Sequence, residues 1–324
     1  MTALDAVAAY QPAARLTVED VAETLGLTEM EVKLFRRFHG LGAVCVDPSI
    51  SLTDLLLGAA AALEPLRGQE HRVRYVLWAR AFPTVAPHPL NPLAEVCRLL
   101  GLEHALAFAV TQQSCASSLL AIDLAGRLLA ADAAAGPNAA DPDAADPDAA
   151  EPLALVLTGE KAFTRDAQLL PGMSLFSEGS SACLVSATGA RDRLLAYACS
   201  QRGEFDTAGG VSAEEFQRQY RPLLAEVIHQ ALAEAGLTLA DLRLILPHNV
   251  NLVTWQRMCR LLGFPVDKVL LDNIAGNGHV FCADAFLNYQ TACQRGMLQT
   301  GDRYLVASVG AGHGATFAAM VFEH

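Results

Sequence analysis

Cys115 is the residue of this chain whose type and position best suit covalent chemistry. It lies between an apolar stretch that predicts a buried strand, 105–111, and a stretch with helical periodicity, 119–131. A thiol at a helix N-terminus faces unpaired backbone N–H groups and the positive end of the helix dipole, and both favour the thiolate. A buried structural cysteine is the alternative, because free cysteines often pack as apolar side chains. From this local pattern alone both interpretations stand.

Two histidines and a carboxylate occupy positions that suit acid–base chemistry. His248 directly follows a predicted buried strand, 242–246, where it could act as a base or donate to a developing oxyanion. His279 ends a glycine-punctuated turn, 273–279, and Asp284 lies five residues further on. A carboxylate beside an imidazole fixes its tautomer and raises its basicity. Each of the three residues could also be purely structural.

A glycine-rich stretch, 310–314, follows the predicted strand 304–308. It is neither a phosphate-binding loop nor a dinucleotide motif, because no lysine follows and a strand rather than a helix continues the chain. It predicts a close approach of backbone, with N–H groups near Gly310 and Ala311 directed at a carbonyl oxygen. No second clustered Cys or His pair accompanies His279 and Cys282, so a metal site is not expected.

The elements that must position these residues occur twice in the chain. Residues 95–102 (EVCRLLGL) resemble residues 257–264 (RMCRLLGF), at an offset of 162 residues. The surrounding predicted elements also pair: the helices 52–66 and 214–236, the strands 74–78 and 242–246, and the short strands 105–111 and 268–271.

This repeat predicts an internally duplicated α/β fold with halves 1–165 and 166–324 and helices between and outside two sheets. Cys115, His248 and His279 would all follow strands, where ligands bind in open α/β architectures.

Composition narrows the class of protein. With 52% hydrophobic residues in 324, a large core is expected, and no unbroken apolar run reaches the roughly 18 residues that cross a bilayer. Eight cysteines without a C-x-x-C pair favour reduced thiols, and the N-terminus lacks the basic region of a signal peptide, so a cytoplasmic protein is expected. The net charge of −12 argues against binding to nucleic acid or anionic membranes.

Half of that charge lies in residues 130–152, an Ala/Asp/Pro-rich stretch without basic residues. Its acidic residues are Asp132, Asp141, Asp143, Asp146, Asp148 and Glu151. The stretch predicts a disordered surface loop within the first half, with a docking role as the alternative.

Taken together, these segments resemble the β-ketoacyl synthase III-type enzymes of the thiolase superfamily, over about residues 16–322. The resemblance rests on the segment around Cys115, Pro247-His248-Asn249-Val250-Asn251, the turn 273–279, Gly301-Asp302 and the stretch 310–314. It implies the five-layered αβαβα thiolase fold and a homodimer in which residues 84–92 reach toward the partner's active site. It also implies acyl-CoA or acyl carrier protein thioesters as substrates and no cofactor.

Carried over to this sequence, the resemblance makes Cys115 the acylated nucleophile and His248 the family histidine. The N–H groups of Cys115 and Ala311 would form the oxyanion hole, with Gly310 and Asn251 beside the substrate.

The third catalytic position departs from the family, which usually has Gly-Asn there. Asn277 keeps the dipeptide, whereas counting back from Gly296 and Gly301 places His279 at this position, with Asp284 as its partner. We favour His279, because this choice keeps the downstream spacing intact. The family's Ala-Cys-Ala-Gly and Gly-Asp-Gly-Ala are also changed, to Ser114-Cys115-Ala116-Ser117 and residues 177–181. These departures indicate a divergent, specialised member.

We therefore expect an acyltransferase of specialised metabolism that loads an acyl group on Cys115 and passes it to an alcohol, amine or thiol. A decarboxylative condensing enzyme that joins an acyl starter to malonyl-ACP is the main alternative. A non-catalytic, ketosynthase-like partner subunit is the third, although such subunits usually lack the cysteine.

Overall fold

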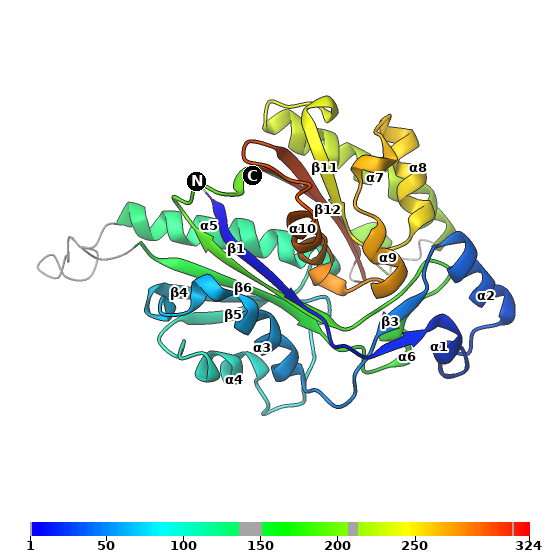
Figure 1. Ribbon diagram of the computed structural model, residues 1–324, viewed down its shortest axis with the longest axis horizontal. Coiled ribbons are helices and arrows are strands. Elements are labelled where there is room, and N and C mark those ends of the chain that lie inside the picture. Colours follow the sequence, from blue (N-terminus) through cyan, green and yellow to red (C-terminus); the bar gives the residue numbers. More distant parts are fainter. Residues whose placement is uncertain (1, 136–150, 207–212, 313) are drawn as a thin grey trace, which may run out of the picture.

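The computed structural model describes residues 2–135, 151–206, 213–312 and 314–324. Within them, nine strands form one mixed sheet in the order β11-β12-β13-β10-β1-β9-β6-β4-β5 (Figure 1). The strands are β1 Ala3–Tyr10, β4 Val73–Ala79, β5 Leu106–Val110, β6 Leu153–Glu160, β9 Gly179–Ser186, β10 Arg193–Arg202, β11 Leu242–Pro247, β12 Arg303–Gly312 and β13 Gly314–Glu323.

The sheet consists of two halves with the same topology. From the middle outwards the first half runs β1, β9, β6, β4, β5, and the second runs β10, β13, β12, β11. In both halves the first two strand pairs are antiparallel and the third is parallel. The halves meet where β1 pairs with β10, at Ala3 and Arg193. The predicted duplication is therefore present in the strand order itself.

The boundary between the halves lies later than the predicted 165/166. Strand β9 completes the first half of the sheet, so the second half begins between Ser186 and Arg193. The prediction placed it too early because a small excursion, α6 Arg165–Gln168, β7 Leu169–Leu170 and β8 Ser174–Leu175, separates β6 from β9.

Helices complete five layers (Figure 1). Helices α5 Ser117–Ala135 and α10 Asp284–Gln294 pack in one core with the inner faces of both halves of the sheet. Helices α3 Leu52–Ala62 and α4 Pro92–Leu99 cover the outer face of the first half. Helices α7 Ala213–Glu234 and α8 Leu252–Leu262 cover the outer face of the second. The layer order is αβαβα, as the resemblance implied.

Alternation along the strands explains how one sheet serves three helix layers. In β12, Tyr304 and Val306 face the central helices, whereas Leu305 and Ala307 face α7 and α8. Successive side chains of a strand point to opposite faces, so a continuous apolar run is buried on both sides.

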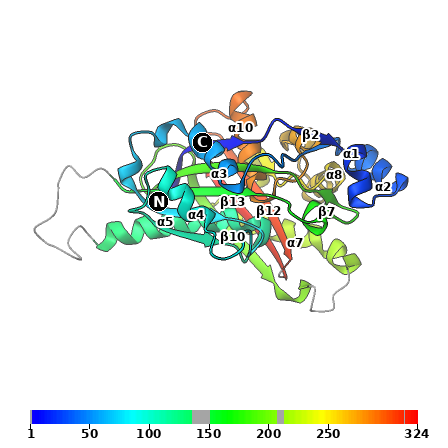
Figure 2. The same ribbon diagram turned by 90° about the horizontal axis from the view of Figure 1, so that it is seen from below.

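A small cap packs on one end of this core, opposite the end that the C-terminus of α5 reaches (Figure 2). It is made of β2 Arg15–Thr17, α1 Val18–Leu25, α2 Glu29–Lys33 and β3 Ala43–Cys45. Its apolar residues pack with Leu169, Leu175 and Ile274, the last in α9 Asp272–Asn277. The cap thus contacts the turn that leads to His279.

Three predicted elements differ from the structure. The helix predicted over 52–66 ends at Ala62, and a short 3-10 turn, Glu64–Leu66, follows it. The expected strand 268–271 is replaced by a short 3-10 turn, Val266–Lys268, and one isolated parallel bridge between Ile245 and Val269. That bridge holds the place that β5 has in the first half. Helix α5 runs to Ala135, beyond the predicted end at 131.

The beginning of the acidic stretch 130–152 is therefore helical rather than loop. Asp132 lies in α5, where it pairs with Arg74 at 2.9 Å and accepts a hydrogen bond from the Tyr75 hydroxyl at 2.8 Å. The rest of the predicted loop, 136–150, lies outside the described residues.

One helical stretch of the described chain, Ser114–Ala135, is long and apolar enough to cross a membrane by length and composition. The sequence expectation of no such stretch counted only unbroken apolar runs. However, 61% of its most apolar window is buried inside the protein, as in the core helix of a soluble domain.

Candidate active site

Cys115 lies in a short 3-10 turn, Ser114–Ala116, between β5 and α5. Ser114 has a φ of 50°, a left-handed conformation that is uncommon outside glycine. Two hydroxyls attach this turn to β12. The Ser114 hydroxyl donates to the carbonyl oxygen of Ala311 at 3.0 Å, and the Ser308 hydroxyl donates to that of Cys115 at 3.1 Å. Cys115 is thus held at the N-terminus of α5, as its sequence position predicted.

Glycine is required where β12 passes the cysteine turn. A Cβ atom at Gly310 would lie 1.9 Å from the carbonyl oxygen of Gln113, so a side chain there would displace backbone. The predicted close approach of the glycine-rich stretch is therefore present. The role of the Ala311 N–H group as an oxyanion donor stays a prediction, and His313 lies outside the described residues.

His279 lies between Cys115 and Asp284. Its backbone N–H donates to Leu175 at 3.0 Å, which fixes the end of the turn. Its Nδ1 hydrogen-bonds the Asp284 carboxylate, and the ring also hydrogen-bonds Cys115. The structure therefore brings together three side chains that the sequence analysis selected: Cys115, His279 and Asp284.

The Asp284 carboxylate is buried and also accepts two backbone N–H groups. Its Oδ2 accepts from Asn249 at 2.5 Å and its Oδ1 from Val280 at 2.6 Å. Hydrogen bonds from backbone N–H groups offset part of the cost of burying a carboxyl group. Asp284 thus joins the segment after β11 to the turn that carries His279.

Neighbouring groups affect the pKa of His279 more strongly than its burial does. Burial alone would lower the pKa of the imidazole, but Asp284 and Cys115 raise that pKa to about 10. His279 therefore holds its proton near neutral pH, with Cys115 on one side and Asp284 on the other.

His248 is in the opposite state. Burial first, and the positive charge of His279 second, lower the pKa of His248 to about 4, so its imidazole is neutral. Its Nδ1 faces the Ala307 carbonyl oxygen at 3.3 Å, and its Nε2 hydrogen-bonds the Tyr220 hydroxyl. The two imidazole rings lie 6.1 Å apart. Two groups of one type with pKa values pushed apart are the arrangement that acid–base chemistry uses.

These side chains line one small cavity of about 40 Å³. Its polar lining comes from Cys115, Tyr220, His248 and His279, and the rest is apolar, including Phe176 and Met173. A water needs roughly 10–15 Å³ of such volume. The cavity therefore has room for about three waters or for a short acyl group in their place.

A second cavity, of about 120 Å³, adjoins the first and shares Met173 and Tyr220 with it. His39, Arg221 and Arg257 line it, and none of the described residues that line it is acidic. In a chain with a net charge of −12 this basic lining is a local reversal that favours an anionic ligand.

Two predicted site residues lie away from the chemistry. Asn277 ends α9 and does not line the catalytic cavity, so the structure brings His279 and not Asn277 to Cys115. Asn251 uses its side chain inside the protein: its oxygen caps α8 at Thr254 (2.7 Å) and its nitrogen donates to Met173 (2.9 Å). Asn251 was expected beside the substrate, and it lines the second cavity rather than the one that contains Cys115.

Sequence reasoning missed Tyr220, Ser308 and Phe176. Phe176 packs against His279 with the two rings tilted and their centroids 4.8 Å apart. Tyr220 lies in an amphipathic helix, and Ser308 lies in an apolar strand, where neither differs in pattern from a packing residue.

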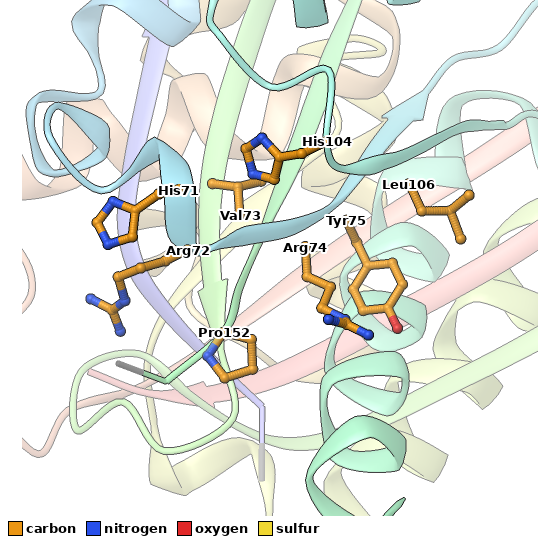
Figure 3. Close-up of a pocket in the computed structure, with 8 residues that line it drawn as sticks. All are labelled: His71, Arg72, Val73, Arg74, Tyr75, His104, Leu106 and Pro152. Carbon is orange, nitrogen blue, oxygen red and sulfur yellow. The ribbon is translucent and has the colours of Figure 1, made fainter. Parts of the chain in front are cut away.

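A larger cavity, of about 450 Å³, lies at the other end of β4 (Figure 3). It is lined by His71, Arg72, Arg74 and His104, but Arg74 already pairs with Asp132. It lies at the N-terminal ends of the parallel strands β4 and β5, whereas the Cys115 turn follows the C-terminal end of β5. Within the described residues no group of three or more His, Cys, Asp or Glu side chains could hold a metal ion.

A family model described as the C-terminal part of 3-oxoacyl-[acyl-carrier-protein (ACP)] synthase III matches residues 232–324. The β-ketoacyl-[acyl-carrier-protein] synthase III 2 of Vibrio cholerae is 28% identical over 256 residues, which are 71% of this chain and 65% of that protein. The β-ketoacyl-[acyl-carrier-protein] synthase III of Rhodobacter capsulatus is 36% identical over 89 residues, 28% of this chain and 27% of that protein. The matches thus cover less than two thirds of either relative.

Solved structures match over the whole chain. ChlB3, described as an acyltransferase, aligns with a TM-score of 0.81 at 20% identity, over 99% of this chain and 97% of its own. The 3-oxoacyl-[acyl-carrier-protein] synthase III of Aquifex aeolicus VF5 aligns with a TM-score of 0.80 at 18% identity, over 100% of both chains. OleA of Xanthomonas campestris gives 0.78 at 16%, over 99% and 98%. The chain therefore has the fold of these solved structures, and parts of its sequence are similar to β-ketoacyl-[acyl-carrier-protein] synthase III enzymes.

Proposed function

We propose that this protein is an acyltransferase that takes a short acyl group from a CoA or carrier-protein thioester onto Cys115 and passes it to an alcohol, amine or thiol. The observation that carries the proposal is the position of His279, hydrogen-bonded on one side to Cys115 and on the other to Asp284. A nucleophile, a base and a group that orients the base are the parts that covalent acyl transfer needs.

In the first half-reaction the Cys115 thiolate attacks the thioester carbonyl. The C–S bond to the donor then breaks, and the departing thiolate takes the proton that His279 holds. The products of this step are the acyl-Cys115 enzyme, a free thiol and a neutral His279.

Acylation prepares His279 for the second half-reaction. The thiolate is one of the charges that raise the pKa of His279, and acylation removes it, while burial continues to lower that pKa. His279, still oriented by Asp284, can then take the proton of an acceptor as the acceptor oxygen, nitrogen or sulfur attacks the acyl carbon. The Cys115 thiolate leaves, and the starting state of the proposed reaction, a Cys115 thiolate beside a protonated His279, is restored.

The cavities support the choice of donor. The catalytic cavity of about 40 Å³ suits a short acyl group. The adjoining cavity, with Arg221 and Arg257, suits the phosphate-bearing part of CoA or of a carrier protein's prosthetic arm. The proposal includes a cytoplasmic homodimer that works in specialised metabolite biosynthesis.

A decarboxylative condensing reaction is the second candidate. The observation that favours it is His248, a second histidine that faces the same cavity. The names of the curated relatives, which are synthases, also favour it. A non-catalytic partner subunit fits less well, because it has no need for a cysteine hydrogen-bonded to an imidazole.

Malonyl-CoA separates the two reactions. We expect intact-protein mass spectrometry to show a malonyl adduct on the wild-type protein that keeps its mass, and that is lost to one member of a panel of primary alcohols, amines and thiols. Release of CO₂ by the wild-type protein, with a β-ketoacyl thioester product, would overturn the proposal and establish the condensing reaction.

A further inference from the structure

Tyr220 is hydrogen-bonded to Nε2 of His248, the ring nitrogen through which His248 could act on a substrate. The Tyr220 hydroxyl hydrogen-bonds His248 Nε2, and the other ring nitrogen, Nδ1, faces the Ala307 carbonyl oxygen at 3.3 Å. Both partners are buried, Tyr220 with 3% of its surface exposed and His248 with 2%. The cavity wall therefore presents the pair, not a free imidazole.

The directions of these two hydrogen bonds follow from the partners. A carbonyl oxygen can only accept, so the proton of the neutral His248 ring belongs on Nδ1. Nε2 is then an acceptor, and the Tyr220 hydroxyl donates to it. The Tyr220 hydroxyl also favours this tautomer, because a buried hydroxyl needs an acceptor and Nε2 is the acceptor that it contacts.

The surroundings of Tyr220 keep it in this position. Its ring makes edge contacts with Phe216 at 5.8 Å and with Phe317 at 6.0 Å. The backbone of His248 is fixed as well, because its carbonyl oxygen accepts from the Trp255 indole at 2.9 Å. Neither ring can leave the hydrogen bond without disturbing packed aromatic neighbours.

We propose that Tyr220 decides the fate of the acyl-enzyme, because its hydroxyl denies His248 the N–H group that a decarboxylation would require. When a malonyl thioester loses CO₂, the bond between the carboxylate carbon and the α-carbon breaks, and the electron pair moves into an enolate whose oxygen needs a donor. The α-carbon then takes a proton from water. With Nε2 accepting from Tyr220, His248 offers no such donor, so acyl transfer is the reaction left. This inference rests on the proposed function and names a positioning residue for it.

The test is the Tyr220→Phe variant with malonyl-CoA, measured as CO₂ released per acylated Cys115. Without the hydroxyl, nothing keeps Nε2 as an acceptor, and the proton can move to Nε2 at the cost only of the Ala307 contact, which at 3.3 Å is long for a hydrogen bond. A single oxyanion donor is worth about 10²–10³ in rate, so we expect the ratio to rise by at least about tenfold. The ratio should return to the wild-type value in Tyr220→Phe with His248→Ala. Tyr75→Phe, which removes a hydroxyl bonded to Asp132 on α5, should leave it unchanged.

An unchanged ratio in Tyr220→Phe, or a rise that persists without His248, would overturn the inference. A second measurement does not depend on any variant. Histidine ¹⁵N chemical shifts of the wild-type protein should show His248 protonated on Nδ1, and protonation on Nε2 would contradict the assignment. Decarboxylation by the wild-type protein itself would instead refute the proposed function, so the two failures are distinguishable.

Discussion

The two halves of the chain contain the same cysteine turn in different surroundings. Ser114–Ala116 and Phe281–Ala283 are both short 3-10 turns that lead into the central helices α5 and α10. The residue before each cysteine has a left-handed φ, 50° at Ser114 and 47° at Phe281. Cys282 is therefore the structural counterpart of Cys115, a relation that the sequence repeat did not suggest.

The partners of the two thiols differ. Cys115 lines the catalytic cavity and hydrogen-bonds His279. Cys282 is enclosed, its thiol donates to the Ser114 carbonyl oxygen at 3.3 Å, and burial raises its pKa well above the usual range. A turn at a helix N-terminus is thus not sufficient for a reactive thiol. In the proposed reaction the first half supplies the nucleophile, Cys115, and the second supplies His279, Asp284 and His248.

Removing Cys115 should abolish acylation, whereas removing Cys282 should leave it nearly unchanged. We expect Cys115→Ala to lose all acyl adduct and to lower transfer by at least about 10³-fold, because the nucleophile is gone. Cys282→Ala should keep most of the wild-type acylation, since that thiol only packs and donates to Ser114. The measurement is the intact mass of each variant after incubation with acetyl-CoA. Comparable losses in the two variants would mean that the turns are functionally equivalent.

His279→Ala should have the next largest effect. It removes the group that holds and returns the proton, and general acid–base catalysis is worth about 10²–10⁴ in rate. Asn277→Ala, two residues away at the end of α9, is the matched control and should stay within about twofold of wild type in single-turnover acylation, because it does not line the cavity. The reverse order of effects would restore Asn277 as the third catalytic residue.

Gly310→Ala tests the contact between β12 and the Cys115 turn. The added Cβ would meet the Gln113 oxygen at 1.9 Å, and overpacking of this kind costs about 1–3 kcal/mol. Gly276→Ala, where nothing lies within 4 Å of the added atom, is the control. Urea unfolding should show the loss only for Gly310→Ala. Equal stabilities would show that β12 does not hold the turn.

The smallest predicted effect separates the two histidines by pH. The pKa of His279 is raised from about 6.5 in an unfolded chain to about 10, so its contribution to stability is full below about pH 6.5 and is lost as the pH rises through about 10. The pKa of His248 is lowered to about 4, so its contribution is present above about pH 6.5 and is lost as the pH falls through about 4.

The measurement is the free energy of unfolding across pH for the wild type, His279→Gln and His248→Gln. We expect the difference from wild type to change on the alkaline side for His279→Gln and on the acid side for His248→Gln. A change on the same side for both would refute the assigned proton positions.

Much of the fold followed from local pattern. The repeated C-R-L-L-G segments lie in α4 and α8, and the predicted apolar strands correspond to β4, β11 and β12. These elements could be predicted because they are buried and regular. The expected strand 268–271 was wrong because pairing with a neighbour, not composition, decides whether four apolar residues form a strand. The predicted loop 130–152 begins too early, because alanine, the main component of residues 130–135, favours continuation of the helix.

The candidate site was predictable only in part. Cys115, His279 and Asp284 carry chemistry in their residue types and lie close to turns, so their spacing could be interpreted. Asn251 has the same visible character, but it is used as a helix cap. Tyr220 could not be found, because its contact with His248 joins residues 28 positions apart through tertiary packing alone.

The central claim is that Cys115, and not its structural counterpart, accepts the acyl group. The most direct test is peptide-level mass spectrometry of the wild-type protein after incubation with a short acyl-CoA, with the peptides of Cys115 and Cys282 compared in the same digest. The account predicts a thioester adduct on the Cys115 peptide and an unmodified Cys282 peptide. An adduct on Cys282, or none on Cys115 with any short acyl-CoA, would contradict it.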